Sequence, residues 1–196
     1  KKDYENSSSI NHLIIEKLLP NDIASKLSEH FPEEKELNHI NAPQENKYVG
    51  IYFSNKQKLV EECIYAFQEE NVINLIREIT NIKKLIGDPE LYAGGISSMS
   101  KGCFLNPHID NSHDRNLENF RRLNLLYYVN KDWDPEEGGG ELVLYPNGIK
   151  NKEEEITCDF NRLVIMRTDN RSLHGVKIIK SESCRRKCIS NYYFSI

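Results

Sequence analysis

From Leu91 to the end of the chain, short β-rich runs alternate with clusters of turn-forming residues. Residues such as Val, Ile, Leu and Tyr favour strands, whereas Gly, Pro, Asn and Asp favour turns. The turn clusters are Gly94-Gly95, Asn106-Pro107, Asp134-Pro135, Gly138-Gly139-Gly140 and Pro146-Asn147-Gly148. Many short strands with turns at this spacing predict a β-sandwich or jelly roll for this half of the chain.

The residues before Leu91 predict helices that support this β-rich half. Apolar residues recur near the helical period over residues 56–82, which predicts an amphipathic helix with one buried face and a break at residues 68–71. A shorter helix is expected to begin at Pro20 and to end before Pro32. We also expect strands at residues 10–19 and 47–53, a frayed start at residues 1–9 and a surface loop at residues 33–46.

The length of 196 residues suits a single domain. We predict one unit over residues 1–196, with a helix-and-strand support in residues 1–90 and a jelly-roll core in residues 91–196. The predicted fold class is therefore mainly β with N-terminal helices. No run of about 18 apolar residues occurs, so no membrane span is expected, and no signal peptide is recognisable.

The formal net charge of −4 argues against a nucleic-acid partner, because such binding needs many Lys and Arg contacts to phosphate. Arg121-Arg122 and Arg185-Arg186-Lys187 are the candidates for a local basic patch. The five cysteines are scattered and form no CxxC pair, which predicts reduced thiols in a cytoplasmic protein. Pairing of Cys184 with Cys188, or metal binding by them, is the alternative.

Three residues could form a metal site. His108 and Asp110 are two positions apart, so on a strand both side chains would share one face. His174 follows a second predicted strand at residues 162–167. Two imidazoles and one carboxylate leave three positions open on an iron ion, enough for a chelating 2-oxoacid and O2. The alternative is a surface His-Asp pair, as at His113-Asp114, and we expect His113 itself to be exposed.

An ordered set of motifs surrounds these residues. They are Gly102-x-x-Leu105-x-x-His108-x-Asp110, residues 125–133 (LLYYVNKDW), Gly139-Gly140-Glu141-Leu142, Asn161-Arg162-Leu163-Val164-Ile165, His174-Gly175-Val176 and residues 186–194 (RKCISNYYF). In this order, residues 96–196 resemble the prolyl-4-hydroxylase-like branch of the 2-oxoglutarate/Fe(II) oxygenases. The resemblance implies a double-stranded β-helix, a cupin-like jelly roll whose open end holds Fe(II) through His108, Asp110 and His174.

The resemblance also implies a pocket for 2-oxoglutarate. Arg186 stands where the family places the residue that binds the distal carboxylate, and a guanidinium suits that task. Strand alternation puts Arg186 on the opposite face from Arg185 and Lys187. Further contacts are expected from Tyr128, Ser190, Leu126 and Leu142, although core packing is the alternative for Tyr128. Two positions depart from the family pattern, because Met99 replaces a tyrosine and Cys188 replaces a serine.

These features predict an oxygenase that hydroxylates a C–H bond and converts 2-oxoglutarate and O2 into succinate and CO2, with ascorbate as a supporting reductant. The carboxylate of Asp110 favours hydroxylation over halogenation. A cupin-type isomerase or hydrolase and a non-catalytic binding module are the rival hypotheses. The substrate, a prolyl residue, an amino acid or a small metabolite, is not encoded in a readable motif. The loops expected to select it are residues 33–46, 111–121 and 147–158.

Overall fold

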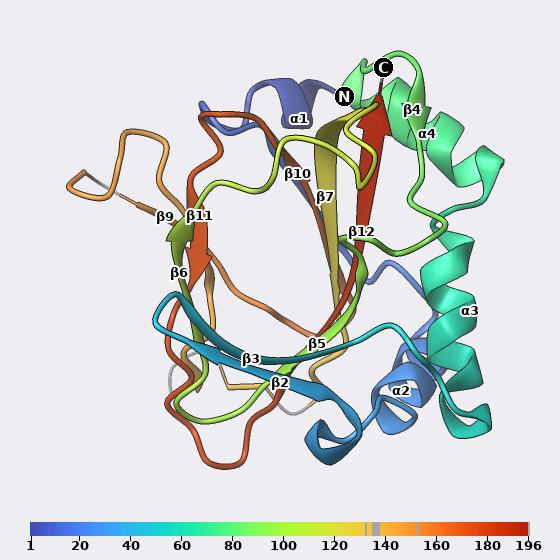
Figure 1. The fold of residues 1–196 in the computed structure, drawn as a ribbon, viewed down its shortest axis with the longest axis vertical. Coiled ribbons are helices and arrows are strands. Elements are labelled where there is room, and N and C mark those ends of the chain that lie inside the picture. Colours follow the sequence, from blue (N-terminus) through green and yellow to red (C-terminus); the bar gives the residue numbers. More distant parts are fainter. Residues whose placement is uncertain (132, 135–137, 152, 196) are drawn as a thin grey trace.

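The protein is a curled antiparallel sheet with helices along one side (Figure 1). The computed structural model describes residues 1–131, 133–134, 138–151 and 153–195. Asp132 and Pro135, which belong to a predicted motif and a predicted turn, lie outside the described residues. Within the described part, the architecture is mainly β with N-terminal helices, as the sequence predicts.

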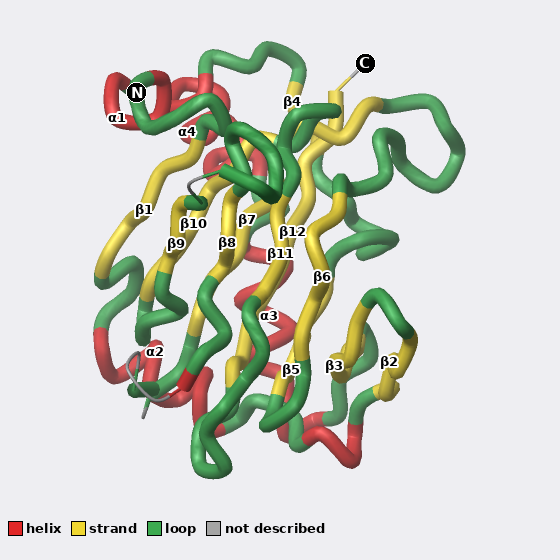
Figure 2. The backbone as a smooth tube through the Cα atoms, turned by 90° about the vertical axis from the view of Figure 1, so that its left-hand side faces the viewer, coloured by secondary structure: helices red, strands yellow, loops and turns green. Residues whose placement is uncertain are grey.

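Ten strands follow one path through the sheet, and two further strands pair at its sides. The order is β1-β10-β7-β12-β5-β3-β6-β11-β8-β9, while β2 pairs with β3 and β4 pairs with β12. The strands are β1 (His12–Glu16), β2 (Asn38–Ala42), β3 (Glu45–Gly50), β4 (Leu85–Ile86), β5 (Gly95–Met99), β6 (Phe104–His108), β7 (Phe120–Tyr128), β8 (Leu142–Leu144), β9 (Glu154–Ile156), β10 (Arg162–Arg167), β11 (His174–Val176) and β12 (Arg186–Ser195). Figure 2 shows this sheet from the side of β8 and β11.

The helices are α1 (Lys2–Glu5), α2 (Asn21–Glu29), α3 (Lys58–Ala66) and α4 (Glu70–Thr80), with short 3-10 turns at Glu34–Glu36 and Asn55–Gln57. The predicted long helix is thus two helices, interrupted at residues 67–69. Glu69 has an extended backbone conformation at the start of α4, which separates the two. Asn81 ends α4 in the left-handed region (φ 58°), a conformation that Asn tolerates well.

Alternation along β7 builds two cores on the two faces of the sheet. Leu123, Leu125 and Tyr127 pack with the helices in one hydrophobic cluster. Leu126 and Tyr128 belong to a second cluster inside the curl, together with residues of β8, β10 and β12. Because successive side chains of a strand point to opposite faces, β7 is buried on both sides. One strand therefore anchors the helices outside and shapes the pocket inside.

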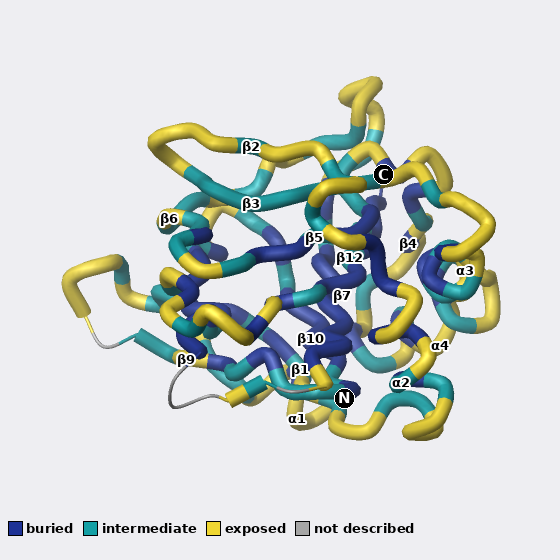
Figure 3. Tube along the Cα trace, turned by 90° about the horizontal axis from the view of Figure 1, so that it is seen from below, coloured by how far each residue is buried: buried dark blue, intermediate teal, exposed yellow. Residues whose placement is uncertain are grey.

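Two N-terminal predictions are wrong. Residues 33–46, predicted as a loop, contain a 3-10 turn and the strand β2, and residues 1–9, predicted to fray, contain α1 with the buried Tyr4. β2 was missed because its sequence, NHINA, shows no apolar alternation and its residues are largely exposed (Figure 3). Its backbone pairs with β3 instead, in a hairpin whose turn contains Pro43 and Gln44.

β3 lies between β5 and β6 in the sheet, so the residues before Leu91 contribute directly to the wall around the interior. Among the described residues, no helix is long and apolar enough to cross a membrane.

Candidate metal centre and cosubstrate pocket

The two histidines of the predicted triad are cross-strand neighbours. β6 pairs with β11 in a register that sets His108 directly opposite His174, and their ring centroids are 4.4 Å apart. The register shifts immediately after His174, where Gly175 meets β6 closely. A Cβ on Gly175 would stand 2.8 Å from the carbonyl oxygen of Leu105. Glycine therefore lets β11 approach β6 and present the second imidazole beside the first.

Hydrogen bonds to the backbone orient both imidazoles. Nδ1 of His108 lies 3.0 Å from the carbonyl oxygen of Asn106, and Nδ1 of His174 lies 2.8 Å from that of Ser172. A carbonyl oxygen only accepts, so each neutral ring carries its proton on Nδ1 and has a free lone pair on Nε2. Both Nε2 atoms face Asp110, at 3.5 Å from Oδ1 for His108 and 4.0 Å from Oδ2 for His174.

Asp110 follows β6 and is held by a buried cation. Its side chain is 10% exposed, and its Oδ1 lies 3.5 Å from Nη1 of Arg121, whose side chain is 6% exposed. Arg121 in turn stacks on the ring of Tyr192, with its Cζ 4.3 Å from the ring centroid. Oδ2 of Asp110 is buried and accepts no hydrogen bond from the described residues. The carboxylate thus keeps an unused acceptor directed at the two imidazoles.

The three groups also shift one another's pKa. Burial raises the pKa of Asp110, but His108, His174 and Arg121 outweigh it and leave this pKa below its usual value. Burial lowers the pKa of His108, but the hydrogen bonds with Asp110 and the Asn106 carbonyl leave it raised. Burial dominates at His174 and lowers its pKa. Asp110 is therefore ionised and His174 neutral at pH 7, the forms that ligate a metal.

This arrangement fits a divalent metal ion. One ligand atom from each of His108, Asp110 and His174 lies within 4.8 Å of the others. The two free Nε2 atoms and the unpartnered Oδ2 converge on one place, and nitrogen and oxygen donors of this kind suit Fe(II). These three residues would hold the ion.

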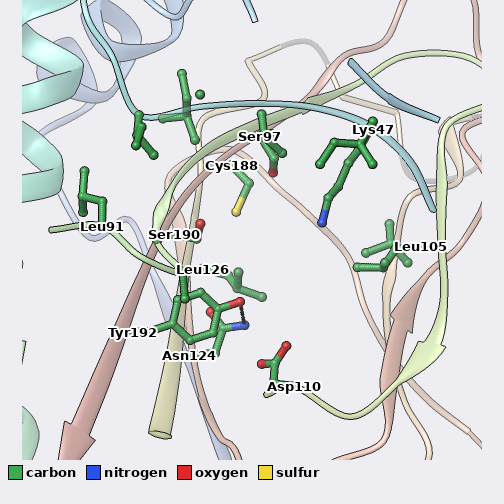
Figure 4. A pocket seen from close by; sticks show the side chains of 18 of the residues that line it. Lys47, Leu91, Ser97, Leu105, Asp110, Asn124, Leu126, Cys188, Ser190 and Tyr192 are labelled. Atoms are coloured by element: carbon green, nitrogen blue, oxygen red, sulfur yellow. Dashed lines mark hydrogen bonds between the residues drawn. The ribbon is translucent and has the colours of Figure 1, made fainter. Parts of the chain in front are cut away.

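The triad lies at one end of a pocket of about 410 Å³ inside the curled sheet. Figure 4 shows Asp110 on one side of this pocket and Cys188 and Ser190 of β12 on another. Leu126 of β7 and Leu142 of β8 contribute apolar wall, as do Leu105 and Val176. The wall of the pocket therefore combines apolar side chains with polar groups.

Arg186 begins β12 in the interior of the protein. It is 3% exposed, whereas the neighbouring Arg185 is exposed, as strand alternation predicts. Its Nε donates to the carbonyl oxygen of Gly140 at 2.9 Å, and its Nη2 donates to the Tyr128 hydroxyl at 3.0 Å. Its Nη1 lies 3.9 Å from the thioether sulfur of Met99, a weak acceptor. The guanidinium is thus fixed in place with donor capacity left for a carboxylate, which fits 2-oxoglutarate.

The other residues predicted to contact 2-oxoglutarate do not all line the pocket. Ser190, Leu126 and Leu142 line the pocket, whereas Tyr128 is fully buried behind Arg186 and is not part of the pocket lining. The ring of Tyr128 lies 4.8 Å from Cζ of Arg186, and burial raises the pKa of its hydroxyl. Tyr128 therefore contacts the guanidinium and orients it. Ser190 Oγ lies 3.4 Å from the carbonyl oxygen of Gly95.

Several pocket residues were not predicted. Asn124 donates from Nδ2 to the Tyr192 hydroxyl at 3.0 Å, and both line the pocket (Figure 4). The alternation that groups Arg186, Cys188 and Ser190 extends to Tyr192 and could have identified it. Arg121 could not be found this way. The pairing of β7 with β12 leaves out Arg122, so Arg121 lies on the face of β7 opposite to the one that regular alternation predicts.

Several other predictions made from the sequence can be compared with the structure. His113 is half-buried and packs on Phe120 at 4.4 Å between ring centroids, so the prediction that it is exposed is wrong. Arg121 is a buried neighbour of the triad and not part of a surface basic patch. Cys188 is a buried free thiol, so it does not form the alternative disulfide with Cys184. Of the three loops expected to select the substrate, the described residues of 147–158 do not line this pocket.

Comparisons with known proteins agree with this geometry. Residues 94–194 match the sequence profile of the 2OG-Fe(II) oxygenase superfamily. Egl nine homolog 1 of Rattus norvegicus is 33% identical over 87 residues, which are 44% of this chain and 23% of that protein. The matched segment is thus about a quarter of that relative's length.

Solved structures share the fold over nearly the whole chain. A prolyl-4-hydroxylase from Pseudomonas putida superposes with a TM-score of 0.72 at 14% identity, covering 100% of this chain and 96% of that one. A prolyl hydroxylase from Trichoplax adhaerens, solved with a peptide fragment of hypoxia inducible factor, gives 0.69 at 17% identity, covering 99% and 86%. The predicted jelly-roll fold is confirmed. The chain belongs to the 2OG-Fe(II) oxygenase superfamily.

Proposed function

We propose that this protein is an Fe(II)- and 2-oxoglutarate-dependent oxygenase that hydroxylates a C–H bond of its substrate. The observation that carries the proposal is one pocket with a metal-ligand set at one end and a buried guanidinium facing it. His108, Asp110 and His174 would hold the iron, and Arg186 would bind the distal carboxylate of 2-oxoglutarate. The bound iron supplies the activation of O2 and the oxidative decarboxylation of 2-oxoglutarate, which give succinate and CO2.

The protein's own groups bind, orient and shield the reactants. The Asn106 and Ser172 carbonyls fix the proton of each imidazole on Nδ1, which keeps Nε2 available. Tyr128 and the Gly140 carbonyl hold the Arg186 guanidinium in one orientation, so little side-chain entropy is lost when a carboxylate binds. Leu126 and Leu142 exclude water around the cosubstrate chain, which strengthens the ionic contact.

The rival hypotheses account for fewer of these features. A cupin-type isomerase or hydrolase would use the metal ligands but gives no role to a buried, oriented Arg186. A non-catalytic binding module explains neither the free Nε2 atoms nor the unpartnered Oδ2 of Asp110. The Trichoplax adhaerens relative, solved with a peptide, makes a peptidyl substrate one candidate, beside a free amino acid or a small metabolite.

The test is succinate release by the purified protein with Fe(II), ascorbate and 2-oxoglutarate. Slow release is expected even without substrate, with loss on changing His108, Asp110 or His174 to Ala. His113→Ala is the matched control, because His113 is close in sequence and does not belong to the ligand set. Full turnover in Asp110→Ala would refute the metal-site assignment. Tight metal binding without any 2-oxoglutarate binding would favour the cupin-type alternative.

A further inference from the structure

A second cavity adjoins the pocket that contains the triad. It has a volume of about 660 Å³, and three of its lining residues, Ile51, Leu91 and Arg115, also line the first pocket. Figure 4 shows Leu91 at the edge of the first pocket, on the side opposite Leu105. The two spaces therefore meet, and a molecule held at the triad can extend into the second cavity.

The walls of this second cavity come from segments outside the strands of the sheet. Residues 51–53 belong to the chain that leaves β3 and runs to α3 (Figure 1). Glu61 and Tyr65 of α3 form another wall, and because they are four residues apart they share one face of the helix. Residues 89–91 form a third. None of the residues expected to bind the metal or 2-oxoglutarate lines this cavity.

Large apolar side chains that solvent reaches gather at this cavity. Tyr52 is 85% exposed, the highest value for a large apolar side chain among the described residues, and Tyr65 and Ile51 are 40% and 37% exposed. Single exposed apolar residues are ordinary, whereas exposed apolar residues that gather in one place mark binding sites. The cavity is therefore a candidate site for a ligand.

The cavity carries one uncompensated negative charge. Its acids and strong bases are Glu61, Glu90 and Arg115. Nη1 of Arg115 lies 3.6 Å from Oε2 of Glu90, and its Cζ lies 5.4 Å from the ring centroid of Tyr92, so the charges of Arg115 and Glu90 compensate each other. The carboxylate of Glu61 makes no hydrogen bond or ion pair within the part of the chain that the structure describes. Glu61 is thus available to a ligand.

A carboxylate and aromatic rings around one cavity suit a cation. The faces of tyrosine rings attract ammonium and guanidinium groups, and the carboxylate supplies a counter-charge and a hydrogen-bond acceptor. A purely apolar ligand would remove water from Glu61 without replacing its hydrogen bonds. The dianion 2-oxoglutarate would be repelled by the same carboxylate. The chemistry of the cavity therefore differs from that of the cosubstrate site at Arg186.

We propose that the cavity lined by Tyr52, Glu61 and Tyr65 binds a cationic group of the substrate, an ammonium or a guanidinium. The inference rests on the proposed function, because it places this group at the end of the substrate remote from the C–H bond that reacts at the triad. A basic side chain of a polypeptide or an amine of a small molecule supplies the same chemistry. Glu61 is then a specificity-determining residue that does not contact the reacting atoms.

The experiment compares the binding of probes that carry or lack this charge. The full chain is loaded with Mn(II) and with N-oxalylglycine, an unreactive analogue of 2-oxoglutarate. N-acetyllysine methylamide and N-acetylnorleucine methylamide, which lacks only the side-chain amino group, are compared by the broadening of their proton resonances, which Mn(II) causes only in molecules bound nearby. Pentylamine, which has the ammonium but no peptide groups, separates a free amine from a basic side chain of a polypeptide.

Three variants accompany the wild type. Glu61→Gln removes the charge and keeps the size of the side chain, and Tyr52→Leu removes an exposed ring, so neither substitution touches the core. Glu62→Gln is the matched control. Glu62 is the next residue of α3, is 59% exposed, lies 3.8 Å from Lys58 and does not line the cavity.

We expect the wild type to bind the lysine probe at least about fivefold more tightly than the norleucine probe. Glu61→Gln should reduce this preference to less than about twofold, and Tyr52→Leu should lower it by at least about twofold. Glu62→Gln should retain it. The affinity for N-oxalylglycine should stay within about twofold of the wild type in all three variants, because none of the three residues lines the first pocket. Both outcomes for pentylamine support the cation site: binding as tight as that of the lysine probe indicates a free amine, and weaker binding indicates a peptidyl group.

The inference is overturned if the wild type shows no preference between the lysine and norleucine probes, a result that needs no variant. A preference that survives in Glu61→Gln, or that falls equally in Glu61→Gln and Glu62→Gln, would also overturn it, because the charge would then act from elsewhere or from α3 as a whole. Failure of the wild type to bind Mn(II) or N-oxalylglycine would instead refute the proposed function, which separates the two failures.

Discussion

Replacing Arg186 by Met should remove 2-oxoglutarate binding while leaving the metal site intact. Arg186 is 3% exposed, so a carboxylate bound to it is shielded from water, and its loss leaves that carboxylate buried without a counter-charge. Truncating one partner of a buried, hydrogen-bonded charge pair costs about 2–5 kcal/mol. At about 1.4 kcal/mol for each factor of ten, the dissociation constant of 2-oxoglutarate should rise about 30-fold to more than 1,000-fold.

The assay is calorimetric titration of 2-oxoglutarate into the Mn(II)-loaded protein without O2. Arg185→Met is the matched control, because Arg185 is the adjacent residue, is exposed and lies 4.0 Å from Glu34 at the surface. The melting temperature of each variant must be measured as well, since Arg186→Met leaves the Gly140 carbonyl without its donor. An Arg186→Met protein that is folded and binds 2-oxoglutarate within threefold of wild type would refute the assignment.

Three further predictions concern the metal site and the core. Arg121→Met should weaken Mn(II) binding by about 10–100-fold, because it removes the cation that holds the proposed ligand Asp110. Arg122→Met is the control. An unchanged Mn(II) affinity in Arg121→Met would show that Arg121 does not position Asp110. Metal affinity should fall by about tenfold per pH unit once the pH drops below the pKa of His108. Because this pKa is raised, the fall should begin above the ordinary histidine value of about 6.5. A metal affinity that stays constant from pH 8 to pH 5 would contradict this prediction. Leu125→Ala should lower the free energy of unfolding by about 2–5 kcal/mol in urea denaturation, since Leu125 is fully buried between the sheet and the helices. A loss below about 1 kcal/mol would contradict this packing.

The candidate metal ligands could be predicted because His108 ends a short strand and Asp110 follows it by two residues. Their two-residue spacing indicated that both side chains could reach the same ion, and the ordered motifs identified His174 as the third ligand. The cross-strand register that brings His174 opposite His108 is a long-range property, and it depends on the close approach at Gly175. Strand alternation also separated Arg186 from Arg185 correctly, since β12 is regular over those residues.

The remaining pocket residues could not be predicted, for physical reasons. Arg121 reaches Asp110 because the pairing of β7 with β12 skips one residue, and a strict alternation would have placed it on the other face. Lys47 lines the pocket because β3 inserts between β5 and β6, a topology that the polar sequence around β2 does not reveal. Tyr128 was expected in the pocket itself, but it lies behind Arg186 and contacts its guanidinium.

The proposed function requires this pocket to couple O2 to the decarboxylation of 2-oxoglutarate. The most direct test is to incubate the Fe(II)-loaded protein with 2-oxoglutarate under ¹⁸O2 and to analyse the succinate by mass spectrometry. One oxygen atom of O2 should enter the new carboxylate of succinate, and Asp110→Ala should form no labelled succinate. Succinate without the label, or intact 2-oxoglutarate in a protein that binds both the metal and 2-oxoglutarate, would contradict the claim.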